Sequence, residues 1–201
     1  MAILRPSLLL LVTGCAVAAD APVHMELAGW SLEATKISAS YQPAHVVVLG
    51  AVLTQGSDSI RADRAEATAL EVKDSTWVLT GNVRVQVPQG ELAADTATIS
   101  FRDNRVAVAS AHGKPATFLQ HTAAGVPAAS GHAQDISIDV AKGEVHLNGE
   151  AWVTREHNDL NACQIVYNIT QQTVDAQKCD NADEGVHGTI ELKQPPAGTH
   201  K

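Results

Sequence analysis

The sequence predicts an all-β fold in which two facing antiparallel sheets are built from stacked two-strand units, with a short solenoid as the alternative. Apolar and polar residues alternate with a period of two, as along Val83–Val87 and Val145–Val153, which is typical of strands with one buried face. Small residues recur about every 30 positions, at Ala34, Ala62, Ala94, Ala133 and Ala162. Units of this size cannot bury an apolar face alone and must stack.

Three glycines mark the middle of the expected strands. Gly50, Gly81 and Gly149 lie within Val46–Leu53, Val78–Val87 and Val145–Val153. A glycine inside a strand indicates a bend or a bulge. The remaining strands are expected at Val106–Phe118, at 64–72 despite its helix-forming composition, and from 136 to 140, where Ile136, Ile138 and Val140 alternate with polar residues. A stack of this kind leaves its first and last strands as open edges.

The composition limits the function classes. The 201 residues suggest one domain, and with 45% hydrophobic but 3% aromatic residues its core must consist of Val, Ile, Leu and Ala. The formal net charge is −8, and no cluster of Lys and Arg is present. Because phosphate backbones are bound by clustered basic residues, nucleic-acid binding is excluded.

The N-terminus has the layout of a secretory signal peptide over residues 1–19. Arg5 precedes the apolar run Leu8–Val12, and small residues allow cleavage after Ala18 or Ala19. The apolar run is shorter than the roughly 20 residues that span a bilayer. Two alternatives stay open, a lipid-modified Cys15 and a retained anchor. We expect one domain over 20–192, an extra N-terminal unit over 26–57 and a disordered tail over 193–201.

A disulfide is predicted between Cys163 and Cys179. If Cys15 leaves with the signal peptide, these two cysteines form an even pair in an oxidising compartment. They flank a predicted hairpin with its turn near Thr170 and Gln171, which places them almost opposite each other and within disulfide reach. Two buried free thiols are the alternative.

The sequence contains no catalytic or cofactor motif. It lacks Gly-x-Ser-x-Gly, a phosphate-binding loop and Cys-x-x-Cys, and its nine histidines do not have the spacing of zinc ligands. Asp63, Asp95 and Asp135 recur in register, which indicates hydrogen bonds at turns or strand ends rather than paired catalytic acids. We therefore expect no enzyme activity, no cofactor and no metal.

The inward apolar face suggests a binding function. With so few aromatics, two facing sheets are hypothesised not to close completely, which would leave an apolar groove for acyl chains, where each buried methylene contributes about 0.8 kcal/mol. The alternatives are a structural solenoid with a filled core, and a β-sandwich enzyme or carbohydrate-binding module, for which the aromatic platform is lacking.

Several segments resemble one known family. "GKPATFLQ" at 113–120 and the stretch 125–153, with "GNV" at 81–83, "LAAD" at 92–95 and "CQIVY" at 163–167, resemble the LptA/OstA family of periplasmic lipopolysaccharide-transport bridges over about residues 58–192. The resemblance implies an OstA-like β-jellyroll that binds the lipid A part of lipopolysaccharide. It also implies head-to-tail self-association through terminal edge strands, which bridges an inner-membrane transport complex and an outer-membrane translocon. A membrane-tethered adaptor of the same complex is the alternative.

The resemblance and the inward face together give a predicted lipid-binding set. Family positions carry over to Ile60, Phe118, Ile138 and Val140, and the inward face adds Leu92 and Ile136. Four departures stand out. The family often has an aromatic residue where Ile138 stands, an apolar residue is usual where Asp58 stands, and neither the unit over 26–57 nor the cysteine pair is a general feature.

Overall fold

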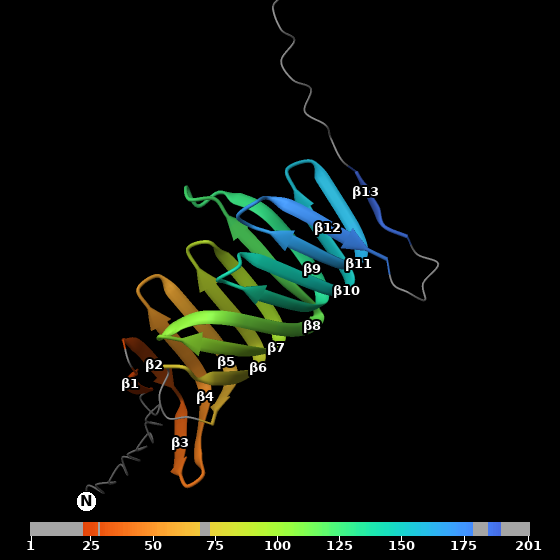
Figure 1. The fold of residues 1–201 in the computed structure, drawn as a ribbon. Coiled ribbons are helices and arrows are strands. Elements are labelled where there is room, and N and C mark those ends of the chain that lie inside the picture. Colours follow the sequence, from red (N-terminus) through yellow and green to blue (C-terminus); the bar gives the residue numbers. More distant parts are fainter. Residues whose placement is uncertain (1–21, 28, 69–72, 179–184, 190–201) are drawn as a thin grey trace, which may run out of the picture.

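A computed structural model describes residues 22–27, 29–68, 73–178 and 185–189. The predicted signal peptide, the predicted tail and Cys179 lie outside these ranges. The described residues form strands (Figure 1), which are β1 (Val23–Leu27), β2 (Trp30–Ala34), β3 (Lys36–Tyr41), β4 (Ala44–Gln55), β5 (Asp58–Ala67), β6 (Thr76–Val87), β7 (Gly90–Arg102), β8 (Arg105–His121), β9 (Pro127–Asp139), β10 (Glu144–Arg155), β11 (Asn158–Asn168), β12 (Thr173–Gln177) and β13 (His187–Thr189). In these ranges no helix is long and apolar enough to cross a membrane.

All the strands belong to one antiparallel sheet, stacked in chain order (Figure 1). The long strands β4 to β11 pair consecutively. At one end β2 and β3 pair with different halves of β4, and at the other end β13 and β12 pair with different halves of β11. The all-β prediction is confirmed, but the two facing layers are halves of the same strands rather than two separate sheets.

A crease divides the long strands into these two halves. The pairing register shifts near mid-strand between each pair from β5–β6 to β10–β11. A bulge bends a strand and increases its twist, so a column of bulges folds the whole sheet. We call the half that contains Ile136 layer A and the half that contains Phe118 layer B. The mouth is the side opposite the crease, where the strands end in turns.

Gly81 shows why the crease requires glycine. Its φ is 77°, and a Cβ there would lie 2.4 Å from Oδ2 of Asp63 on the neighbouring strand. Left-handed backbone and this close approach both exclude a larger residue. Asp63 in turn accepts a hydrogen bond from Nδ2 of Asn82 at 2.8 Å, and Asn82 also has a positive φ of 47°. The mid-strand bend predicted at Gly81 is confirmed.

The repeat predicts that each recurring alanine starts a strand, but in the structure these alanines line the crease instead. Ala62 pairs with Ala51 across β4 and β5, and Ala162 pairs with Ala151 across β10 and β11. Each of the repeated small residues is at most 7% exposed. Because the two layers converge at the crease, small side chains fit there and larger ones lie farther out.

Two contacts show that the layers face each other. The Trp30 ring of layer B meets the Phe101 ring of layer A edge-on at a centroid distance of 5.7 Å, and Trp30 Nε1 donates to the carbonyl oxygen of Asn104 at 3.1 Å. Nearer the other end, the Tyr167 hydroxyl of layer A donates to Oε1 of Gln120 in layer B at 2.7 Å. Both contacts span the interior near the mouth.

Two predicted inward residues leave the buried face. Alternation from Val106 predicts that Val108 points inward, but Val108 is half-buried and pairs with Ser100, because a second register shift between Ser100 and Phe101 makes Ala109 the inward residue. Val140 lies beyond the end of β9 and is 55% exposed. The strict alternation predicted across these positions is therefore wrong at both, since period two holds only where no bulge or turn intervenes.

Candidate functional site

The candidate site is the apolar interior between the layers. Ile60, Leu92 and Phe118 lie in one row of layer B, where Ile60 pairs with Val85, Val85 with Leu92 and Leu92 with Phe118. Ile136 lies in layer A and is 1% exposed. The fold therefore brings four of the six predicted lipid-binding residues to the same interior, on both of its walls.

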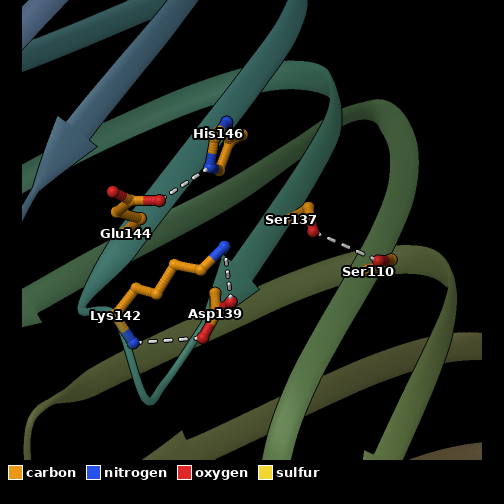
Figure 2. A network of polar contacts seen from close by, with 6 residues as sticks. All are labelled: Ser110, Ser137, Asp139, Lys142, Glu144 and His146. Carbon is orange, nitrogen blue, oxygen red and sulfur yellow. Dashed lines mark hydrogen bonds and ion pairs between the residues drawn. The ribbon is translucent and has the colours of Figure 1, made fainter.

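The other two predicted residues lie at the mouth. Ile138 is half-buried and packs against the edge of the core. Val140 lies in the turn between β9 and β10. The Lys142 backbone N–H donates to Oδ1 of Asp139 at 3.1 Å, and Lys142 Nζ forms an ion pair with Oδ2 of Asp139 at 3.4 Å, which closes the turn (Figure 2). The hydrogen bond from the Lys142 backbone N–H lowers the pKa of the Asp139 carboxyl. The turn thus holds Val140 in solvent at the rim of the interior.

The interior is closed in this structure. Ile60 and Leu92 are each 3% exposed, Phe118 is 6% exposed, and Ile99, Leu147 and Ile165 are fully buried. The hypothesis that few aromatics would leave an unfilled groove is wrong for this state, because the alanine-lined crease lets the layers approach until their side chains meet. Access for a lipid would require the layers to part at the mouth.

Sequence reasoning missed the contacts that hold the mouth shut. The Tyr167–Gln120 bond joins residues 47 positions apart and the Trp30–Asn104 bond joins residues 74 apart, so no local pattern relates the partners. Tyr167 is 1% exposed. Burial raises the pKa of its hydroxyl, against smaller opposing effects of the Arg155 charge and the hydrogen bond to Gln120.

Replacing Tyr167 with phenylalanine should cost about 1 kcal/mol of folding free energy at neutral pH, because Gln120 loses its partner. The folded-state pKa of Tyr167 lies above the unfolded value of 10.0. The stabilisation of the folded state by the Tyr167 hydroxyl is therefore complete below pH 10, and it is lost as the pH rises through the folded-state pKa. Urea unfolding should be measured at about pH 8 and about pH 11. The difference in free energy of unfolding between wild type and Tyr167→Phe should be smaller at the higher pH.

The matched control for that measurement is Tyr41→Phe. Tyr41 lies at the end of β3 and is 78% exposed. Its removal should leave the free energy of unfolding unchanged at both pH values. A gap for Tyr167→Phe that does not depend on pH would contradict the effect of burial on its pKa.

The outer faces are polar. On layer A, the Oγ atoms of Ser110 in β8 and Ser137 in β9 lie 3.3 Å apart. Nε2 of His146 lies 3.4 Å from Oε2 of Glu144 (Figure 2). On layer B the Trp152 ring stacks on His132 at a centroid distance of 5.2 Å. Trp30 and Trp77 are buried, so the described tryptophans form no extended platform for sugars. No cluster of three potential metal ligands occurs in the described part of the chain.

The predicted disulfide involves one described cysteine. Cys163 lies in β11, and the predicted hairpin is present, with β12 paired to β11 and the intervening turn at residues 169–172. Gln164 pairs with Gln177. Cys179 lies outside the described residues, so the bridge stays a prediction.

The geometry defines the class to which this protein belongs. Its members have an open antiparallel sheet that is creased along its length and encloses an apolar interior between its two halves. A family model described as "LptA/(LptD N-terminal domain) LPS transport protein" matches residues 65–173, and the chain belongs to this family. The family consists of transport proteins rather than enzymes, which confirms the prediction that the chain is not an enzyme. Residues 26–57, predicted as an extra unit, precede the matched region and form strands from β1 to β4.

The relatives agree with this assignment. The lipopolysaccharide export system protein LptA of Escherichia coli K12 is 27% identical over 114 residues, or 56% of this chain and 61% of the relative, and that of Shigella flexneri matches equally. The chain thus spans less than two thirds of these relatives' length. The crystal structure of LptH, described as the LptA-homologous periplasmic component of the lipopolysaccharide transport device of Pseudomonas aeruginosa, aligns with a TM-score of 0.55 and 25% identity, covering 66% of this chain and 94% of LptH.

Proposed function

We propose that this protein is a periplasmic bridge that carries lipopolysaccharide from the inner to the outer membrane, with the acyl chains held between layers A and B. The observation that carries the proposal is the continuous apolar interior, which runs from β2 to β11 and contains Ile60, Leu92, Phe118 and Ile136. Membership of the lipopolysaccharide-transport family and the likeness to LptH support it.

In this proposal lipid enters where the layers part at the mouth. Ile138, which is half-buried, and Val140, which is exposed, make the rim apolar between the two closing contacts. Each methylene that leaves water contributes about 0.8 kcal/mol. One acyl chain of ordinary length thus outweighs the Tyr167–Gln120 hydrogen bond, whose net contribution is about 1 kcal/mol. The closed interior is then the lipid-free state.

The edge strands support head-to-tail assembly in the same proposal. Among the described strands, β3 pairs only with β4, and every residue in it except Ile37 is exposed. At the other end the described part of the chain pairs β12 only with β11, and β12 is exposed apart from Ala176. Exposed edges accept a further strand by backbone hydrogen bonding. Copies of this chain, the inner-membrane transport complex and the outer-membrane translocon are the proposed partners at these edges.

Photo-crosslinking tests the interior directly. A photoreactive amino acid at Phe118 or at Ile138 should form adducts with lipopolysaccharide in cells, because both side chains reach the interior or its rim. The matched controls are Ser137 and His146. Ser137 precedes Ile138 in β9, and His146 of β10 pairs with Ser137, but both side chains point to the outer face. Adducts from Ser137 and His146 without adducts from Phe118 and Ile138 would refute binding between the layers.

A further inference from the structure

The outer face of layer B carries two arginines that lie directly opposite each other. Arg61 of β5 pairs with Arg84 of β6, and both are exposed. Like charges in directly opposed positions destabilise a sheet. The chain has 14 basic against 22 acidic residues, so an opposed basic pair is not explained by a general excess of positive charge. An anion bound between the two guanidinium groups would offset this repulsion.

These arginines line a depression of about 470 Å³ on the outer face. Five apolar residues contribute to its lining, namely Val85, Leu92, Ala93, Phe118 and Leu119. Polar side chains surround the arginines, namely Ser59, Gln86, Glu91 and Thr117. The depression therefore offers hydroxyl and amide donors beside the two guanidinium groups, and it lies on the opposite side of the sheet from the interior.

The two guanidinium groups are available for a ligand. Arg84 Nη1 donates to the carbonyl oxygen of Val83 at 2.8 Å, which holds the side chain against the sheet. For Arg61, no ion pair or side-chain hydrogen bond is found within the described ranges. Arg64, further along the same strand, is by contrast bound to Glu66. Glu91, an acidic residue that lines the depression, forms no ion pair with either arginine in the described part of the chain.

We propose that this depression is a binding site for a phosphate group, a second site separate from the interior and independent of the acyl-chain proposal. A guanidinium presents paired N–H donors that match two phosphate oxygens, and two such groups match the charge of a phosphomonoester. Ser59 and Thr117 supply further donors. Glu91 and Gln86 can accept hydrogen bonds from hydroxyls, so the phosphate of a hydroxyl-rich carrier such as a sugar satisfies the polar part of the lining, and free phosphate satisfies less of it.

The test is an NMR titration of the full chain at low ionic strength with glucose 6-phosphate, inorganic phosphate and glucose. We expect saturable shifts of the Arg61, Arg84 and Thr117 amides with glucose 6-phosphate and none with glucose. A tighter response to glucose 6-phosphate identifies a phosphorylated sugar as the ligand class, and an equal response to inorganic phosphate identifies free phosphate. Saturation by glucose alone, or no saturable shift with either phosphate, would overturn the proposal.

Variants separate a site from general electrostatics. Arg61→Gln and Arg84→Gln should each weaken phosphate binding about tenfold or more, because each removes a charge-assisted pair. Arg61→Gln should also leave the ligand-free protein as stable as wild type or slightly more stable, since the like-charge repulsion is relieved. A purely structural arginine would show a loss of stability in that variant.

The matched control is Arg102→Gln. Arg102 lies directly opposite Arg105 in β7 and β8, but beside the turn that contains Asp103 and away from the depression. Phosphate affinity should be unchanged in this variant. An equal loss of affinity in Arg102→Gln and Arg84→Gln would show attraction of phosphate to any arginine pair and would refute the site.

Discussion

Replacing Gly131 with alanine is expected to destabilise the protein by about 3 kcal/mol, the upper part of the range for overpacked cores. Gly131 lies in β9, opposite Phe118 on one side and Val153 on the other. A Cβ at this position would lie 2.5 Å from Cε1 of Phe118 and 2.6 Å from the carbonyl oxygen of Trp152. The aromatic ring could rotate away, but the backbone oxygen is fixed by the sheet, so the strands themselves would have to separate.

Urea unfolding gives the measurement, with Gly185→Ala as the control. A Cβ added at Gly185 would meet no atom of the described residues within 4 Å, so this replacement should leave the unfolding midpoint unchanged. A shift for Gly131→Ala of less than about 0.5 kcal/mol, the range of ordinary surface substitutions, would contradict the tight packing of Phe118 over β9. Because Phe118 belongs to the proposed lipid-binding set, the variant should also alter crosslinking at that position.

The strands were predictable because their signal is local. Alternation of apolar and polar residues is a property of neighbouring residues, and Ile60, Leu92 and Ile136 follow it into the interior. The recurring alanines were recognised as a repeat, but the sequence could not show that they line a crease. That requires the register of each strand pair, which bulges set one residue at a time.

Contacts between the layers could not be predicted. Trp30 and Tyr167 read as ordinary apolar positions of strands, and their partners lie 74 and 47 residues away. The prediction that Val140 faces the interior is wrong for a local reason. A turn closed by Asp139 and Lys142 ends the strand at Asp139, although the apolar–polar alternation continues to Val140. Period-two patterns locate strands, whereas their ends and their long-range partners depend on polar contacts that the pattern does not contain.

Replacing Trp30 with alanine is expected to have the largest effect of all, about 3–5 kcal/mol by the usual cost of truncating a buried aromatic residue. Trp30 is 1% exposed, packs edge-on against Phe101 and donates to the carbonyl oxygen of Asn104. It lies in the predicted N-terminal unit, before the region that the family model matches. Hydrogen exchange measures the effect. We expect faster exchange in β1, in β2 and at the turn that contains Asn104.

The loss should stay local because each strand contacts mainly its neighbours in the sheet. In such stacked architectures stability is close to a sum over units and their interfaces. Exchange in β9 to β11 should therefore stay slow in Trp30→Ala. Trp77→Ala provides the comparison, since Trp77 is also buried but lies in β6, between β5 and β7, so its loss should speed exchange in the central strands.

Trp30→Ala also tests whether the N-terminal unit restricts entry to the interior. Without the indole, Phe101, which is 5% exposed, loses its cover at that end of the mouth. Lipopolysaccharide crosslinking at Phe118 should then increase relative to the wild-type background, because the contact of Trp30 with the opposite layer is gone. Unchanged crosslinking combined with fast exchange in β2 would mean that lipid enters elsewhere along the mouth and that Trp30 serves stability alone. Uniformly faster exchange across all strands would instead show that the sheet unfolds as one unit, against the additive behaviour expected of a stack.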